Sequence, residues 1–489
     1  MITINYTPTK CQLTGDVSKE ISDVLYNLLS FQVSGYEFMP SYVEGRWDGY
    51  LHYYSTKTHV FKPGLLSLVT SALTSAGIEY SVTGFPELVR YAQQGDYVSR
   101  DYQEDVLASM FSNVRGIVKS PPRSGKTLIA GAFLDQSRLF PAVFLCNSID
   151  IASQTLVCFK KYIPDCEFGF IGDGEFSIGD VTICTVQAAI SAYEVEYKTK
   201  RAKRRIIQGK PYKKIGSENI LTNDQRLLLR ELFETAQTFI LDECHHSAAV
   251  TSIFLFTKII SAKAVFGLSA TPGYGTEDDL AIEATLGRIF YDISYHDLIS
   301  RGWLLPPKIF FYKLPKHACS SNMYPTIYSE AIVNNTHRNT VISRLTQHLN
   351  SKNKTVLIVV DKKLHGDNIA ALLPNAVRLY GDAELQHRNS VKSKFNSGEI
   401  KCVISTLWDE GVDIPGLHYV INAAGGTSPI DTHQRLRSIT PNPNDPNKKF
   451  GGVIDFIQRE KYLRTHYAIR RALYEKEPDF LIFNKELTL

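Results

Sequence analysis

A lysine and a threonine stand where an apolar stretch gives way to a helical one. The segment SPPRSGKT, from Ser120 to Thr127, follows the β-type run GIVK and precedes the helical run LIAGAFLDQ. Gly125 lets the backbone turn its amides toward a phosphate, Lys126 reaches the β- and γ-phosphates, and the Thr127 hydroxyl suits Mg²⁺. The pattern predicts a phosphate-binding loop in which Ser124, Gly125, Lys126 and Thr127 bind ATP, although Ser120 stands where Gly or Ala is usual.

Two adjacent carboxylates follow another apolar strand. Asp242 and Glu243 come directly after TFIL and before Cys244 and His245. Carboxylates at a strand's C-terminal end can hold Mg²⁺ and orient an attacking water, which are both needed for phosphoryl transfer. We therefore assign Asp242 to the metal and Glu243 to the general base, with Lys126 as a further catalytic group. A surface acidic pair is the alternative interpretation.

The order of these segments resembles the DExD/H-box helicases of superfamily 2. DECH at 242–245 and SAT at 269–271 resemble motifs II and III of that superfamily, and NSIDIASQ at 147–154 resembles motif Ia. The resemblance covers most of residues 95–460 and implies an ATP hydrolase that uses ATP and Mg²⁺. Tyr102 and Gln103 resemble its adenine-reading element. Thr185 and Gln187 resemble a segment that touches the nucleic-acid backbone.

A later segment resembles motif V of the same superfamily. TLWDEGVDIP at 406–415 follows the strand CVIS and is preceded by YGD at 380–382. In the family, Thr406 would contact the phosphate backbone, while Gly411 and Asp413 would line the ATP side of a cleft. A loop after a buried strand, with its acidic residues in solvent, is the alternative.

Motif VI departs from the family pattern. The family reads Gln-x-x-Gly-Arg-x-x-Arg, whereas Gln434 is followed here by RLRSITP. Sliding the alignment places the first arginine on Arg435 and leaves Ser438 in the place of the second. An arginine finger neutralises transition-state charge and strongly affects turnover. We expect Arg435 to serve as the finger, with Arg437 as the alternative.

The first 92 residues are expected to form a small α/β module, called the front module below. It begins with β-type stretches and a helix from Val17 to Leu29. The segment 38–66, with GRWDG and FKPGLL, resembles the N-terminal module of phage UvsW-type helicases, which branch-migrate and unwind forked or crossed DNA. An exposed Arg46 could position a phosphate and Trp47 could stack on a base. Core packing of Trp47 is the alternative.

Alternating strands and helices are expected to position these groups. From Arg100 onward, short apolar runs (GIVKS, AVFLCN, VTICT, TFILDE, AVFGLSA) alternate with helical text, which is typical of a parallel sheet. A second alternation runs from TVLIVV to GGVIDFI. We predict two tandem RecA-like parallel-sheet lobes, at 93–305 and 306–489, after the α/β module at 1–92. A basic insertion at about 197–214 is either a DNA grip or a solvated loop.

The composition limits the possible function classes but does not identify one of them. The chain has 489 residues and a net charge of +4, so its charge permits nucleic-acid binding and does not prove it. Its 8 cysteines form no CxxC pair, and neither a signal peptide nor a bilayer-spanning run is present. We expect a cytoplasmic protein, in the host cytoplasm if it is phage-encoded, with no membrane partner.

Together these features predict an ATP-dependent DNA helicase or translocase that acts on branched or forked DNA in recombination, replication or repair. An RNA helicase of the same superfamily is the first alternative, since such a module could also hold duplex RNA. The second is a binding or remodelling factor with weak ATPase activity, supported by the displaced motif VI. A restriction motor is disfavoured because the chain has no nuclease constellation and no room for one.

Overall fold

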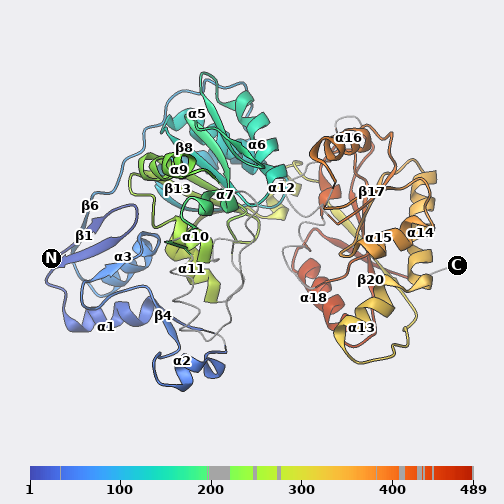
Figure 1. The fold of residues 1–489 in the computed structure, drawn as a ribbon, viewed down its shortest axis with the longest axis horizontal. Coiled ribbons are helices and arrows are strands. Elements are labelled where there is room, and N and C mark those ends of the chain that lie inside the picture. Colours follow the sequence, from blue (N-terminus) through green and yellow to red (C-terminus); the bar gives the residue numbers. More distant parts are fainter. Residues whose placement is uncertain are drawn as a thin grey trace. The chain divides into compact units, whose positions relative to one another are not determined.

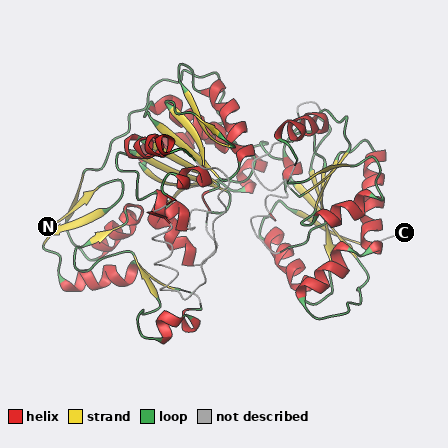
Figure 2. Ribbon diagram, viewed as in Figure 1, coloured by secondary structure: helices red, strands yellow, loops and turns green. Residues whose placement is uncertain are grey.

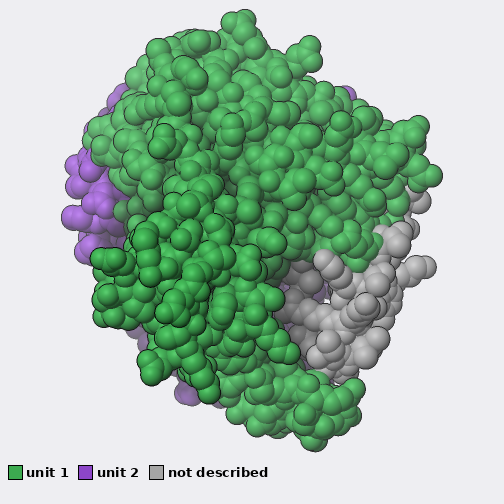
Figure 3. All heavy atoms as spheres, turned by 90° about the vertical axis from the view of Figure 1, so that its left-hand side faces the viewer, with its two compact units in different colours: residues 1–120, 125–292 green, residues 121–124, 293–489 purple. Residues whose placement is uncertain are grey.

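The computed structural model describes residues 1–33, 35–194, 196–197, 221–245, 250–272, 277–381, 383–406, 414–426, 432, 436–442 and 445–486. The chain divides into two compact units, residues 1–120 with 125–292 and residues 121–124 with 293–489 (Figure 3). Most of the predicted basic insertion lies outside the described residues. The predicted boundaries after residues 92 and 305 stay predictions.

The front module is built around a small mixed sheet with the strand order β5-β2-β1-β6 (Figure 1). β1 pairs antiparallel with β2 and parallel with β6. The predicted first helix is present but shorter, because the Ser18 side chain caps it by accepting from the N–H of Ile21. The elements are β1 (Ile2–Tyr6), β2 (Cys11–Gly15), α1 (Lys19–Leu28), β3 (Ser30–Gln32), α2 (Pro40–Val43), β4 (Tyr50–His52), β5 (Val60–Phe61), η2 (Pro63–Leu65), α3 (Leu66–Ser75) and β6 (Tyr80–Thr83).

The rest of the first unit is a large sheet with the order β10-β9-β11-β8-β12-β13-β7-β14. All its neighbouring pairs are parallel except β10 with β9. Its strands are β7 (Arg115–Lys119), β8 (Ala142–Cys146), β9 (Phe168–Gly172), β10 (Glu175–Phe176), β11 (Val181–Thr185), β12 (Thr238–Asp242), β13 (Ala264–Ser269) and β14 (Ile289–Asp292). Its helices are α4 (Asp101–Ser112), α5 (Lys126–Ser137), α6 (Ile149–Tyr162), α7 (Val186–Ser191), α9 (Asn223–Thr235), α10 (Val250–Leu255) and α11 (Glu277–Leu286).

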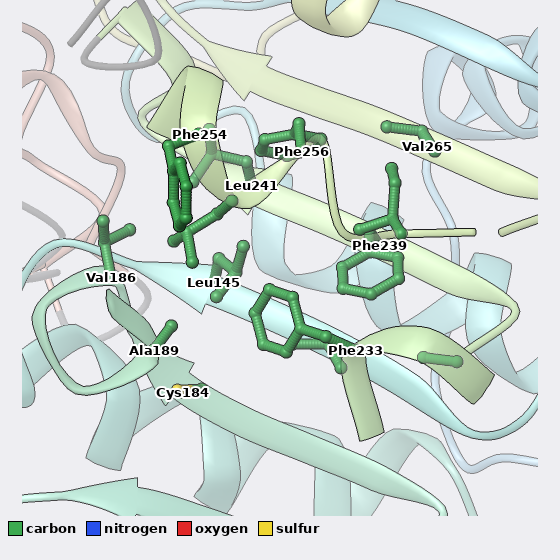
Figure 4. Packing of buried hydrophobic residues seen from close by; sticks show 14 of the residues in the cluster. Leu145, Cys184, Val186, Ala189, Phe233, Phe239, Leu241, Phe254, Phe256 and Val265 are labelled. Atoms are coloured by element: carbon green, nitrogen blue, oxygen red, sulfur yellow. The ribbon is translucent and has the colours of Figure 1, made fainter. Parts of the chain in front are cut away.

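Helices lie on both faces of this sheet (Figure 2), so its central strands are buried on both sides. That explains why the sequence shows continuous apolar runs rather than alternation. One of its two cores contains Phe233 and Phe239, whose ring centroids lie 5.3 Å apart (Figure 4). Val118 and Phe266 belong to the other core.

The second unit contains an entirely parallel sheet with the order β17-β18-β16-β19-β20-β15-β21. Its strands are β15 (Pro307–Lys313), β16 (Val356–Val359), β17 (Val377–Leu379), β18 (Cys402–Ser405), β19 (Tyr419–Asn422), β20 (Gly451–Ile457) and β21 (Leu481–Lys485). Its helices are α12 (Tyr295–Ser300), α13 (Tyr324–Tyr328), α14 (Thr336–Ser351), α15 (Lys363–Ala370), α16 (Leu385–Asn396) and α18 (Leu463–Glu475). The predicted α/β class with two parallel sheets is confirmed.

The cysteines and the helices can be compared with what the sequence predicts. All eight cysteines are free thiols. Within the described part of the chain, the helices are too short or too polar to cross a bilayer.

Candidate nucleotide site and nucleic-acid contacts

The phosphate-binding loop lies between β7 and α5, as predicted. Gly125 has φ +79° and caps α5, which begins at Lys126. A β-carbon at Gly125 would lie 2.5 Å from Nε2 of Gln103. Both the left-handed backbone and this close approach require glycine. Lys126 and Thr127 therefore occupy the first turn of a helix whose N-terminus attracts anions, while Ser124 directly precedes the glycine and is buried.

The predicted acidic pair reaches the same edge of the sheet. In the order β12-β13-β7 the strands are parallel, so their C-terminal ends lie together. Nζ of Lys126 lies 3.3 Å from Oε1 of Glu243, and both side chains are 11% exposed. Asp242 ends β12 and accepts a hydrogen bond from the backbone N–H of Glu243 at 3.0 Å. The four residues predicted to carry the chemistry, including Thr127, thus share one edge.

Glu243 is held in an unusual backbone conformation. Its φ is +47°, which a residue with a side chain adopts rarely. Non-glycine residues in this region concentrate at functional sites, because the surroundings must hold them there. The hydrogen bond to Asp242 supplies part of that support, and it turns the Glu243 side chain toward Lys126.

His245 connects the acidic pair to Ser269, although the sequence singled out neither contact. Nδ1 of His245 lies 3.0 Å from Oγ of Ser269 and 3.4 Å from Oε2 of Glu243. The Ser269 hydroxyl also accepts from the N–H of Thr271 at 3.1 Å. The segments resembling motifs II and III are therefore joined by one buried polar network.

Cys244 fills the space behind the acidic pair. It is fully buried, and burial, together with the charges of Glu243 and Asp242, holds the pKa of its thiol well above its usual range. It packs so closely on β13 that a β-carbon at Gly267 would lie 2.8 Å from its Sγ. The cysteine therefore acts as a small apolar side chain here rather than as a nucleophile.

The two residues predicted to read adenine, Tyr102 and Gln103, lie in α4, and Gln103 approaches the phosphate loop. Tyr102 is 0% exposed and Gln103 is 1% exposed. Oε1 of Gln103 accepts from the backbone N–H of Arg100 at 2.9 Å and so caps its own helix, α4. Nη1 of Arg100 donates to the Tyr102 hydroxyl at 3.0 Å. Both side chains predicted to bind the base are thus packed within the protein, and Nε2 of Gln103 lies close to Gly125.

The two residues predicted to contact nucleic acid in the first lobe differ in their exposure. The hydroxyl oxygen of Thr185 caps α7 by accepting from the N–H of Ala188 at 3.2 Å, and this residue is 8% exposed. Gln187 lies in the first turn of the same helix and is exposed. The predicted motif Ia segment forms the beginning of α6, where the Ser148 hydroxyl caps the helix through the N–H of Ile151.

The predicted residues of the second lobe are only partly described. Thr406 directly follows β18 and is half-buried. Gly411, Asp413 and Arg435 lie outside the described residues. Arg437 is the first residue of a short 3₁₀ turn, Arg437–Ile439. Its side chain is not among the described parts of the structure.

A buried ion pair that the sequence did not reveal supports the approach to motif VI. Arg470 from α18 binds Asp455 of β20 through two hydrogen bonds of 2.8 Å, and both side chains are almost fully buried. Nη1 of Arg470 donates to the carbonyl of Gly426 at 2.7 Å. Asn422 also donates to Asp455, at 3.0 Å. The network therefore holds the end of β19 and the turn after it, but nothing in the local sequence pattern marks it.

In the front module, Arg46 and Trp47 follow α2, between β3 and β4. Arg46 forms an exposed ion pair with Glu44. Trp47 is half-buried, and its indole N–H donates to the carbonyl of Tyr50 at 2.7 Å. Arg46 is therefore accessible to solvent but already has a carboxylate partner. The indole N–H of Trp47 is already used in a hydrogen bond.

Two family descriptions match the chain. Residues 96–274 match "Type III restriction enzyme, res subunit", and residues 338–437 match "Helicase conserved C-terminal domain". The first segment includes the phosphate loop, the acidic pair and the Ser269 network. The second runs from α14 to Arg437.

Similar proteins come from viruses and from a eukaryote. The protein designated helicase 22 in Sulfolobus islandicus filamentous virus is 24% identical over 92% of this chain and 86% of its own length. The ATP-dependent DNA helicase uvsW of Enterobacteria phage T4 is 21% identical over 92% of this chain and 91% of its own. The structure of S. cerevisiae Dbp5 bound to RNA and ADP BeF3 has a TM-score of 0.52 at 15% identity, over 79% of this chain and 89% of that one. The last likeness shows a shared fold.

Proposed function

Because the chain is an ATP-dependent helicase of superfamily 2, we propose that it is a DNA motor that acts on branched DNA. It would migrate branches or unwind forks and junctions during recombination, replication or repair. Its place of action would be the cytoplasm, that of a host cell if the protein is phage-encoded. The two lobes would grip the phosphate backbone, so the motor would prefer a DNA shape rather than a base sequence.

The extent of the match with uvsW of phage T4 carries this proposal. That protein is named a DNA helicase, and the match covers 92% of this chain. Neither family description covers the front module, because the first matched segment begins at residue 96. A match over 92% must extend into residues 1–92, so the likeness includes the part that we propose to recognise branched DNA.

The geometry of the site fits ATP hydrolysis. Lys126 would bind the β- and γ-phosphates, and the amides at the start of α5 would hold the same groups. Glu243 would orient and deprotonate the attacking water. The ion pair between these two residues, at 3.3 Å, holds both side chains close to where the phosphates would lie. Binding of the phosphates by Lys126 would leave Glu243 available to the water.

The oxygen atoms of Thr127 and Asp242 suit Mg²⁺. Hard oxygen ligands are those that Mg²⁺ prefers, and it usually takes one or two from the protein and the rest from water and phosphates. Among the described residues, no group of three or more His, Cys, Asp or Glu side chains could hold a metal ion. When bound, the ion would neutralise the charge that develops on the phosphates.

The residues proposed to contact nucleic acid or adenine differ in their exposure to solvent. Gln187 is exposed and can reach a backbone, whereas the Thr185 hydroxyl would have to donate its proton while its oxygen still caps α7. Thr406 would make the equivalent contact in the second lobe. In the front module Arg46 would exchange Glu44 for a phosphate, and Trp47 would offer its ring face to a base. Tyr102 and Gln103 would have to turn outward to read adenine, and Gly411 and Asp413 would line the ATP side of the cleft.

The experiment that tests this proposal measures ATP hydrolysis by wild type, Lys126→Ala and the control Lys263→Ala. Lys263 is an exposed lysine of the same lobe. Each protein is assayed without nucleic acid and with single-stranded DNA, a four-way DNA junction or duplex RNA. Strong stimulation of wild type and control by the junction, absent in Lys126→Ala, supports a branched-DNA motor. Stimulation by RNA alone assigns the motor to RNA, and no hydrolysis with any substrate overturns the proposal.

A further inference from the structure

Helix α11 belongs to two hydrophobic cores at once. Ile282 and Leu286 are buried in the core of the large sheet, which also contains Cys244 of the DECH segment. Ala284 lies between them in the helix, is 2% exposed and belongs to the core of the front module. Leu280 packs against that second core as well. One short helix therefore packs both in the core that contains Cys244 and in the core of the front module.

The front module meets the end of α11 backbone to backbone. Gly64 lies in η2, and a β-carbon at this position would overlap the carbonyl oxygen of Glu283. The same β-carbon would lie 2.8 Å from the carbonyl oxygen of Ala284 and 2.8 Å from the backbone nitrogen of Gly287. Glycine is needed here for close approach rather than for its backbone angles. No side chain separates η2 from the end of α11 at this point, so a shift of α11 would directly displace η2 of the front module.

Arg115 ties three segments together beside this contact. Its Nη1 donates to the carbonyl of Thr285, near the end of α11, at 2.6 Å. Its Nη2 donates to the carbonyl of Pro8 in the front module at 2.6 Å, and its Nε lies 3.4 Å from the hydroxyl of Tyr6. The planar guanidinium can satisfy several acceptors in fixed directions, which lysine cannot do.

The same arginine is the first residue of β7. The other end of β7 leads to the phosphate-binding loop, and the strand pairs with β13, which ends at Ser269. α11 is the first described helix after Ser269 along the chain. Arg115 thus joins the front module to the strand before the phosphate loop and to the helix after the Ser269 network.

We propose that Arg115 and Gly64 form a coupling joint, through which engagement of branched DNA by the front module alters ATP turnover. Arg115 is a positioning residue, because it touches neither substrate nor reacting atoms. The proposal rests on the proposed function, since it needs a front module that engages DNA. Coupling between two sites is reciprocal for binding. A nucleotide in the ATP site should therefore change the affinity for a junction, and the joint should carry that change.

The test uses the full chain with Arg115→Met and Gly64→Ala. Methionine keeps an unbranched apolar stem but removes all the donors, while alanine pushes η2 away from α11. Two quantities are measured. The first is the ratio of kcat with a four-way DNA junction to kcat without DNA. The second is the ratio of junction Kd values with and without a non-hydrolysable ATP analogue. Couplings of this kind commonly amount to about 5- to 150-fold.

Matched controls separate coupling from simple loss of stability. Arg226→Met removes an arginine of the same lobe that binds Glu194 and the carbonyl of Leu221. Gly77→Ala places a β-carbon in open space within the front module, with nothing within 4 Å, although its φ of +68° strains an alanine there. Basal kcat without DNA and the thermal midpoint are recorded for all four variants.

We expect both joint variants to keep basal kcat within about threefold and to lose most of both ratios, by about fivefold or more. Both controls should keep the ratios of wild type. If the joint variants retain the ratios, or if the controls lose them equally, the joint is not the coupling element. A wild type that no DNA stimulates overturns the proposed function instead, so the two failures are distinguishable. Should Arg115→Met fail to fold, Gly64→Ala decides the question alone.

Discussion

Nζ of Lys126 lies 3.3 Å from Oε1 of Glu243, with both side chains 11% exposed. The lysine begins α5 and the glutamate follows β12, and β13 lies between their strands in the sheet. Each charge compensates the other in a site that is mostly withdrawn from water. Removing one partner of such a pair leaves a poorly solvated charge, so changes here affect stability as well as chemistry.

Glu243→Gln should separate ATP binding from hydrolysis. The amide oxygen can still accept a hydrogen bond from Lys126, so the variant should fold and bind nucleotide, although part of the stabilisation from the ion pair is lost. The amide cannot accept a proton from water, so kcat should fall by about 10² to 10⁴. ATPase assays and the binding of a fluorescent nucleotide measure the two effects, with the exposed Glu234→Gln as the control. Hydrolysis at the wild-type rate would remove Glu243 from its role as base.

Gly267→Ala should damage the acidic pair from behind. The new β-carbon would lie 2.7 Å from Cδ1 of Leu286 and 2.8 Å from Sγ of Cys244. Overpacking of this kind costs about 1 to 3 kcal/mol, and it would displace the residue next to Glu243. We expect a lower thermal midpoint and a lower kcat. Adding Leu286→Val removes the nearest atom and should recover part of both losses; no recovery would mean that Leu286 is not the source of the strain.

The local pattern predicted the elements but not the contacts that depend on distant parts of the chain. Apolar runs bounded by turns predicted both parallel sheets, because strands buried on two faces need continuous apolar sequence. The phosphate loop and the acidic pair were predicted because each lies at the end of such a strand. Arg115 and Thr285, by contrast, are separated by 170 residues, and no local rule places an arginine against that carbonyl.

Local rules also gave an incomplete description of several predicted site residues. Gln103 was expected at the adenine base, yet its oxygen caps α4 and its nitrogen faces Gly125. Thr185 was expected at a phosphate, and its hydroxyl oxygen caps α7. Arg46 was expected to be exposed, which it is, but Glu44 lies next to it. In each case a side-chain hydrogen bond within a few residues competes with the proposed ligand.

Arg470→Met should destabilise the second unit far more than the same change at its neighbour. Removing Arg470 leaves Asp455 buried without its ion-pair partner, which typically costs about 3 to 5 kcal/mol. Arg471→Met breaks a more exposed pair with Glu475, which is worth about 0 to 1 kcal/mol, together with hydrogen bonds to the Tyr467 hydroxyl and Asn484. Urea unfolding followed by circular dichroism compares the two variants. Equal losses would show that the buried pair does not stabilise this unit.

The same variant should slow turnover, because Arg470 also holds the carbonyl of Gly426 ahead of motif VI. We expect kcat to fall in Arg470→Met and not in Arg471→Met, with the ATP affinity less affected. Arg435→Ala and Arg437→Ala, assayed alongside, identify the finger as the arginine whose loss reduces kcat most. A normal kcat in Arg470→Met, measured below its unfolding transition, would exclude a link between this network and catalysis.

His365 should make the second unit sensitive to mild acid. Burial, aided by the positive charge of Arg338, lowers the pKa of His365 from its ordinary value of 6.5 to about 3. A histidine with a lowered pKa in the folded state stabilises the fold above its unfolded pKa, and this contribution is lost as the pH falls from about 6.5 toward 3. At about pH 5 the loss should amount to about 2 kcal/mol.

Replacing this histidine should therefore flatten the response to pH. In His365→Gln, the decrease in the urea midpoint between about pH 7.5 and about pH 5 should be smaller than in wild type, even if the variant is less stable overall. His348→Gln changes an exposed histidine of α14 and should keep the wild-type decrease. Nε2 of His365 donates to Oδ1 of Asn339 at 3.1 Å within the buried interior, so protonation must either break that packing or leave a buried charge beside Arg338. An unchanged decrease in His365→Gln would mean that other groups carry the acid sensitivity.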